Sequence, residues 1–166
     1  MISSWSSKTS NVRSLLVWKS RDNNKPSLAD MLRPSIQTLK HIILNFYDVV
    51  TDDGDPLFGI PSEFEEMRTK NIIETVTIGI LFRECASFRL VGDESDVWGR
   101  LDEILTSPGW FSLKRVSLAI GIPSSNSEGN KLEALRNIPD SLAQFPQLSS
   151  SNSVSIDIDV KVNPMM

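Results

Sequence analysis

Five short apolar runs with one shared spacing restrict what this chain can fold into more than any other feature. Each run follows the pattern apolar-x-x-apolar-x-apolar, and a segment with helical spacing precedes every run except the first. A helix-then-strand unit that recurs predicts a stack of similar units, each covering the apolar edge of the next. The runs are Val12/Leu15/Val17, Leu39/Ile42/Leu44, Ile73/Val76/Ile78, Leu113/Val116/Leu118 and a degenerate copy at Val154/Ile156/Ile158.

The distances between these runs narrow the prediction. From the fourth position of one run to that of the next, the chain advances 27, 34, 40 and again 40 residues. Regular leucine-rich repeats have a period of roughly 20–29 residues, so only the first interval fits that class. We therefore expect an α/β fold that is a leucine-rich-repeat-like solenoid. It would be a parallel, curved sheet of about five strands with helices of variable length on its outer face.

Local signals predict the individual elements. Branched and aromatic residues favour strands at 11–18, 39–47, 72–82, 113–122 and 154–162. Helices are predicted from Ser27 to Pro34, over 62–69, over 97–105 and over 132–138. Ser62 and Glu65 match a capping box at the start of the second helix. The serine-rich stretch 149–153 is predicted to be a connector.

The chain length and composition favour one domain. Of the 166 residues, 40% are hydrophobic and 23% are charged, which is ordinary for a globular protein. We expect a single α/β domain over 11–162, a poorly ordered segment over 1–10 and a frayed tail over 163–166. Trp98 and Trp110 are expected to pack between helix and strand.

Charge and cysteine content exclude several classes of partner and site. The net charge of −4 argues against a broad nucleic-acid or anionic-membrane footprint, and no apolar run has the length of a membrane span. The single cysteine, Cys85, rules out an intrachain disulfide and a multi-cysteine zinc site. We expect an intracellular protein, cytoplasmic or nuclear, that binds protein partners and carries no cofactor.

The same spacing predicts a candidate binding surface. If the fourth and sixth positions of each run face the helices, the alternate side chains line the open face of the sheet. Trp18 and Arg115 are the strongest candidates there, because interfaces favour Trp and Arg as anchors. An alternative is that the N-terminal segment covers Leu16 and Ile43. The predicted surface comprises Leu16, Trp18, His41, Ile43, Asn45, Thr75, Thr77, Arg115, Ser117, Asp157 and Asp159.

Residues with potential for chemistry do not form a recognisable catalytic or metal-binding pattern. His41 is the only histidine, and no spacing joins it to a nucleophile and an orienting carboxylate. Asp52, Asp53 and Asp55 are the best oxygen-ligand cluster, but they lack the spacing of a calcium loop and are typical of an acidic turn. We therefore predict no catalytic residues and no metal site.

Other isolated reactive groups have structural interpretations. Cys85 is typical of an inert, half-buried thiol beyond a strand. The glutamates at 63, 65 and 66 lie where the dipole at a helix start favours negative charge. The scattered glycines match no nucleotide-binding motif.

Four segments together resemble the C-terminal region of F-box-type proteins from mushroom-forming fungi. The likeness extends over about 28–162. In that family an F-box docks on a ubiquitin-ligase scaffold, and a degenerate leucine-rich-repeat-like region follows that is presumed to recruit the substrate. The segments are Glu63-x-x-x-Met67-Arg-Thr-Lys-Asn-Ile-Ile-Glu-Thr-Val76, Trp98-Gly-Arg-Leu-Asp-Glu-Ile-Leu105, Pro108-Gly-Trp-Phe-Ser-Leu-Lys-Arg-Val116 and Phe145-Pro-Gln-Leu-Ser-Ser-Ser-Asn-Ser153.

The resemblance implies the function of the recognition half of such an adaptor. An F-box, a helical segment usually opened by Leu-Pro, has no match in residues 1–25, so scaffold binding requires an F-box upstream of this chain. The primary hypothesis is therefore a protein–protein interaction module. The alternatives are a small α/β enzyme with a doubly wound sheet, or a truncated gene product with no independent function.

Overall fold

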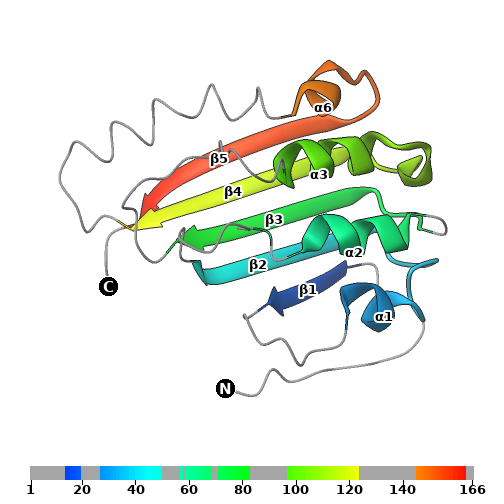
Figure 1. The fold of residues 1–166 in the computed structure, drawn as a ribbon, viewed down its shortest axis with the longest axis horizontal. Helices are drawn as coiled ribbons and strands as arrows, with labels where there is room; N and C mark the ends of the chain where they lie inside the picture. Colours follow the sequence, from blue (N-terminus) through cyan, green and yellow to red (C-terminus); the bar gives the residue numbers. More distant parts are fainter. Residues whose placement is uncertain are drawn as a thin grey trace.

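A parallel β-sheet forms the centre of the computed structural model, which describes residues 14–19, 27–49, 57, 59–68, 71–82, 97–123 and 145–163. The strands follow one another across the sheet in the order β1-β2-β3-β4-β5, and every neighbouring pair is parallel (Figure 1). The strands are β1 (Ser14–Lys19), β2 (His41–Val49), β3 (Thr75–Phe82), β4 (Arg115–Pro123) and β5 (Ser155–Asn163).

The described helices all lie on one face of this sheet, towards the end where the strands begin (Figure 1). Parallel pairing requires the chain to return to that end after each strand, and helices are the usual means of doing so. The prediction of an α/β fold with a parallel sheet and helices is therefore confirmed. The helices are α1 (Leu28–Leu32), α2 (Ile60–Met67), α3 (Val97–Thr106), the single 3₁₀ turn η2 (Pro108–Trp110) and α6 (Pro146–Ser150).

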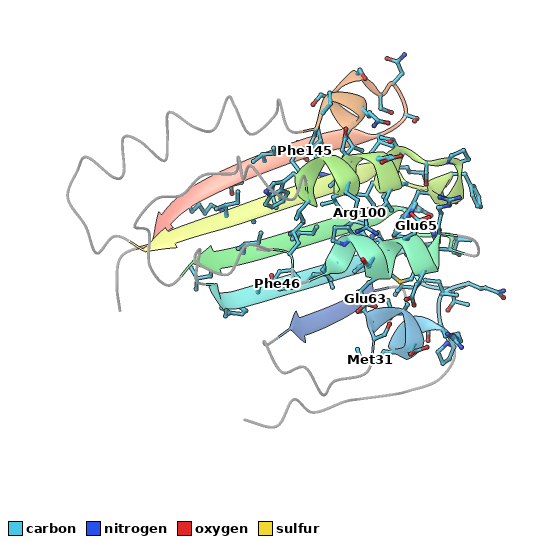
Figure 2. All side chains as sticks on the ribbon, in the orientation of Figure 1. Met31, Phe46, Glu63, Glu65, Arg100 and Phe145 are labelled. Carbon is cyan, nitrogen blue, oxygen red and sulfur yellow. The ribbon has the colours of Figure 1, made fainter. Side chains whose placement is uncertain are left out.

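The recurring apolar spacing corresponds to straight rows across the sheet. In one such row, Leu15 pairs with Ile42, Ile42 with Val76, Val76 with Val116, and Val116 with Ile156. In the inner strands, the fourth and sixth positions of each run are buried under the helices (Figure 2). The first positions, such as Leu39, lie just before the strands and are buried too. The pattern therefore encodes the core, as the alternation of a strand requires.

Aromatic side chains join neighbouring elements of the helix layer. The rings of Trp98 and Phe145 meet edge to face at 5.8 Å, and those of Phe64 and Trp110 lie 5.2 Å apart. Trp98 and Trp110 are both buried, and the ring that each one meets belongs to the helix layer. Their predicted packing against the strands stays a prediction. Such ring pairs add to the stabilisation from apolar burial.

The predicted capping box at Ser62 is wrong. Helix α2 begins at Ile60, and its N-cap is Gly59, whose backbone has a positive φ of 77° that favours glycine. Ser62 therefore lies inside the first turn. Pro61 also stands in that turn, where the missing amide hydrogen costs nothing.

The region near 149–153 also differs from the prediction. Residues 146–150 form helix α6, so the serine-rich connector is shorter than expected. The cap of α6 comes from a distant residue: Asp102 of α3 accepts hydrogen bonds from the backbone amides of Gln147 and Leu148, at 2.9 and 2.8 Å. No local pattern carries that signal, because the interacting residues are 45 and 46 positions apart.

Several predictions fall outside the described residues. These are the helix over 132–138, the N-terminal segment 1–10 and the last three residues of the predicted tail. Strand β5 extends through Asn163, so the first residue of the expected tail belongs to the strand instead.

Candidate functional site

The open face of the sheet is the face on which none of the described helices lies. We define it by the alternate residues of β2 to β5, which are half-buried or exposed, whereas the residues between them within β2, β3 and β4 are buried wherever their side chains are described. The pairing aligns them in rows, for example Ile43 with Thr77, Ser117 and Asp157. The open face comprises His41, Ile43, Asn45, Tyr47, Thr75, Thr77, Gly79, Leu81, Arg115, Ser117, Ala119, Gly121, Ser155, Asp157, Asp159 and Lys161.

Nine of the eleven residues predicted for the binding surface lie on this face, from His41 to Asp159. The other two, Leu16 and Trp18, pair in register with Ile43 and Asn45 at the β1 edge, and their side chains lie outside the description. The alternation of the strands was sufficient to place these residues together. Their contact with a partner stays a prediction.

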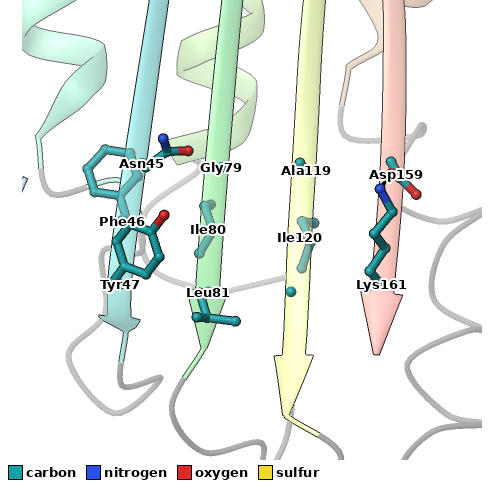
Figure 3. Close-up of a pocket in the computed structure, with 11 residues that line it drawn as sticks. Asn45, Phe46, Tyr47, Gly79, Ile80, Leu81, Ala119, Ile120, Asp159 and Lys161 are labelled. Carbon is teal, nitrogen blue, oxygen red and sulfur yellow. Dashed lines mark ion pairs between the residues drawn. The ribbon is translucent and has the colours of Figure 1, made fainter. Parts of the chain in front are cut away.

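A shallow hollow of about 200 Å³ lies on the open face near the carboxyl ends of the strands (Figure 3). Its floor is low because Gly79, Ala119 and Gly121 carry little or no side chain there. Asn45 and Tyr47 line it from β2, and the pair Asp159 and Lys161 lines it from β5. Leu81 is the remaining open-face residue around it.

The sequence prediction missed this hollow, although a signal for it was present. Gly79, Ala119 and Gly121 all occupy open-face positions, and small residues at such positions lower the surface locally. Asn45 leans over Gly79, since a Cβ atom placed on that glycine would lie 2.3 Å from Asn45 Oδ1. Tyr47 is 46% exposed, an unusually open position for an aromatic ring in a strand.

The charges of the open face are balanced by pairs. Arg115 directs Nε and Nη2 at Asp157 Oδ2, at 2.8 and 2.6 Å, so the predicted anchor is already engaged within the chain. Lys161 Nζ lies 2.7 Å from Asp159 Oδ2. Because each of these carboxylates has a cation beside it, the two pairs add no net charge to the open face.

A second charged row crosses the sheet at the end where the strands begin. The carboxylate of Glu74 is held by Lys40 on one side and by Lys114 on the other, the latter at 2.9 Å. These two hydrogen bonds lower the pKa of Glu74 from 4.5 to about 2, and the bond from Lys40 makes the larger contribution. All three residues follow the first apolar position of their run, so the alternation Lys, Glu, Lys was a readable signal that sequence reasoning missed.

The remaining chemical candidates have structural roles or lie outside the description. Glu63 Oε2 accepts from Ser27 Oγ at 2.6 Å and from the Ala29 amide at 3.1 Å, so it caps α1. Glu65 of α2 pairs with Arg68, the C-cap residue of that helix, and Glu66 is exposed. His41 is half-buried on the open face, at the start of β2. Outside the described residues lie Cys85, Asp52, Asp53 and Asp55.

Comparison of the chain with protein-family models, with curated proteins and with solved structures found no match. Within the described residues, no group of three or more His, Cys, Asp or Glu side chains is arranged to hold a metal ion. None of the described helices has the length and apolar character that a membrane crossing requires. The geometry of the open face is therefore the main guide to function.

Proposed function

We propose that this chain is a protein–protein interaction module that binds its partner on the open face. The observation that carries the proposal is the one-sided helix layer: the described helices cover one face of the sheet and leave the other with a hollow. Half-buried Ile43 and exposed Tyr47 offer apolar contacts beside polar Asn45 and Thr77. Such a mixture of apolar and hydrogen-bonding groups is typical of protein interfaces.

We further propose that the module is a leucine-rich-repeat-like solenoid and the substrate-recognition region of an F-box-type ubiquitin-ligase adaptor. The sequential order of parallel strands, with the described helices on one face, supports this class because each strand is added beside the previous one. The resemblance of residues 28–162 to that family supports it independently. Binding to the ligase scaffold requires an F-box outside this chain.

A small α/β enzyme is the less favoured alternative. A doubly wound sheet reverses its strand order at a switch point and carries helices on both faces, and it binds its ligand where the order reverses. The described strands run in chain order across the sheet and provide no such reversal. The geometry therefore favours recognition over catalysis.

Charge insertion in the hollow tests the proposed surface. Proteins that the natural full-length protein captures in cells would be identified by mass spectrometry, and direct binding of the purified partner would then be measured. Ala119→Arg fills the floor of the hollow without touching the core, since Ala119 is exposed. We expect at least about a tenfold loss of affinity, the equivalent of one disrupted interface anchor.

Glu103→Arg is the matched control, because Glu103 is exposed on α3 in the helix layer. Its affinity for the partner should stay within about twofold of wild type. Equal binding by wild type and Ala119→Arg would contradict the open-face proposal. Recovery of partners without any ubiquitin-ligase scaffold would contradict the adaptor proposal and leave the recognition surface intact.

A further inference from the structure

Strand β5 lies at one edge of the sheet, and its apolar side chains are less buried than those of the inner strands. Val116 and Leu118 of β4 are 2% and 3% exposed, whereas Ile156 and Ile158, which pair with them in register, are only partly buried. Among the described strands, none pairs with the far side of β5. An edge strand of this length, Ser155–Asn163, is a template for pairing with another chain.

The backbone of β5 determines which residues point outward. The Ser155 amide donates to the Lys114 carbonyl, and Ser155 pairs with Arg115, so the odd-numbered residues bond to β4. The even-numbered residues from Ile156 to Val162 therefore direct their amide hydrogens and carbonyls away from β4, to the edge with which none of the described strands pairs, because both groups of a residue point to one side. Any partner strand must bond to these even positions.

We propose that the partner of this edge is a second copy of the chain, paired antiparallel through β5 about a two-fold axis at Val160. In this register Val160 faces Val160 of the second copy, and Ile158 faces Val162. Both are hydrogen-bonded pairs of outward-directed residues, as antiparallel pairing requires. The interface is isologous, so it closes on itself and forms a dimer.

The charges on the open face select this register. With the axis at Val160, Asp159 of each copy faces Lys161 of the other, twice across the interface. An axis at Asp159 places that carboxylate opposite itself, an axis at Lys161 opposes two ammonium groups, and an axis at Ile158 opposes Asp157 to Asp159. Directly opposed like charges destabilise a strand pair, so these three registers are disfavoured. An axis at Val162 opposes no like charges, but it places Lys161 opposite Asn163 and forms no pair between Asp159 and Lys161.

Within one copy, Lys161 Nζ already lies 2.7 Å from Asp159 Oδ2. Pairing at Val160 therefore brings two such pairs together into a ring of four alternating charges, two from each copy. Networks of this kind contribute more than isolated exposed pairs. The self-complementary order of acid and base on β5 is the charge complementarity that identifies a second copy as the occupant.

The helix layer leaves room for this arrangement. Helix α6 lies over the beginning of β5, and the proposed axis lies towards its other end (Figure 1). In the antiparallel second copy, α6 lies beyond the opposite end of the paired β5 strands. Both open faces then look to the same side, and the hollows lined by Asp159 and Lys161 become neighbours across the axis.

Charge exchange tests the proposal on the full chain by sedimentation equilibrium from about 10 µM to about 1 mM, a range that detects weak dimers. Wild type should form dimers. Asp159→Lys and Lys161→Asp should each weaken homodimerisation at least about tenfold, since two attractive pairs become repulsive. A one-to-one mixture of the two variants should restore dimers, because the two ammonium groups of one variant then face the two carboxylates of the other.

Two further variants distinguish loss of the dimer from misfolding and from a non-specific effect of charge. Val160→Pro removes an amide hydrogen that points away from β4, so it should abolish the dimer while circular dichroism shows an intact fold. Asp157→Lys makes the same charge change as Asp159→Lys but faces Asn163 in this register, so its dimer should stay within about threefold of wild type.

Several outcomes would overturn the proposal. Wild type that remains monomeric throughout the concentration range excludes the dimer, and a mixture that fails to reassociate excludes the register. If Asp157→Lys weakened dimerisation as much as Asp159→Lys does, the register would also be excluded. Assemblies that grow continuously with concentration would indicate head-to-tail pairing of β5 with β1. Tyr47→Ala, on β2 at the other side of the hollow, should weaken partner binding and leave dimerisation unchanged, so loss of partner binding and loss of the dimer are separable.

Discussion

The two faces of the sheet are formed by alternate residues of the same strands, yet they differ in what surrounds them. On the helix-covered face, Leu118 and the residues of its row in β2 and β3, Leu44 and Ile78, are almost fully buried. On the open face, Ser117 and Ala119 are half-buried or exposed. A shift of one residue along a strand therefore changes a side chain from core to candidate recognition surface. The contrast predicts that mutations one residue apart will differ sharply in their effects.

The largest expected difference is between Leu118→Ala and Ser117→Ala. Leu118 is 3% exposed, so its truncation should lower the free energy of unfolding by about 2–5 kcal/mol. Ser117→Ala on the open face should change it by less than about 0.5 kcal/mol. Urea unfolding followed by circular dichroism measures both. Similar losses for the two variants would mean that the open face is packed as tightly as the helix-covered face.

A buried amide gives the next largest effect. Asn71 donates to the carbonyls of Met67 and Gly109, at 3.0 and 3.2 Å, and accepts from the Ile73 amide at 3.2 Å. Asn71→Ala leaves these buried backbone groups without their partner, so the free energy of unfolding should fall by about 2–3 kcal/mol.

Asn152→Ala is the control for this prediction, because Asn152 is exposed before β5. Its free energy of unfolding should match wild type in the same urea titration. If Asn71→Ala were equally neutral, the link that Asn71 makes between α2, η2 and the start of β3 would contribute nothing to stability.

Two glycines extend the comparison between the faces. A Cβ atom on Gly109, in the helix layer, would lie 2.5 Å from the Arg68 carbonyl oxygen, so Gly109→Ala forces backbone apart. We expect a loss of about 1–3 kcal/mol, measured by thermal unfolding. On the open face, a Cβ atom on Gly79 meets only the end of the Asn45 side chain closely, and that side chain can rotate away.

Gly79→Ala should therefore cost less than about 1 kcal/mol, because a strand tolerates alanine where space can be made. The variant also displaces Asn45 from the hollow, so the free energy of partner binding should fall by more than the free energy of unfolding. A greater loss of stability at Gly79 than at Gly109 would reverse the assignment of rigid and adaptable faces.

The smallest effect concerns the Lys40–Glu74–Lys114 row. Folding lowers the pKa of Glu74 to about 2, so the ionised carboxylate stabilises the folded state. This contribution is complete well above pH 4.5 and is lost as the pH falls from 4.5 towards 2. Wild type should therefore exceed Glu74→Gln in stability at neutral pH, and the gap should close in acid. A gap that is constant with pH, or unaffected by added salt, would contradict this.

Sequence reasoning predicted the rows of the sheet well and the helix ends poorly. Ile42, Val76 and Val116 were assigned to one face, and the structure places them in one buried row. Strand alternation is a local property, so spacing alone reveals it. The cap at Gly59 was missed because a capping pattern at Ser62 competed with it. Helix α6 was missed because its cap, Asp102, comes from another helix.

The candidate site divides in the same way. The chain sequence specifies which residues share the open face, since each strand alternates with a period of two wherever it lies. The hollow, the Arg115–Asp157 pair and the row around Glu74 depend on which strands are neighbours and in what register. Those contacts join residues 34 to 42 positions apart. The spacing of residues along the chain does not predict these contacts, because long-range packing sets the register of the strands.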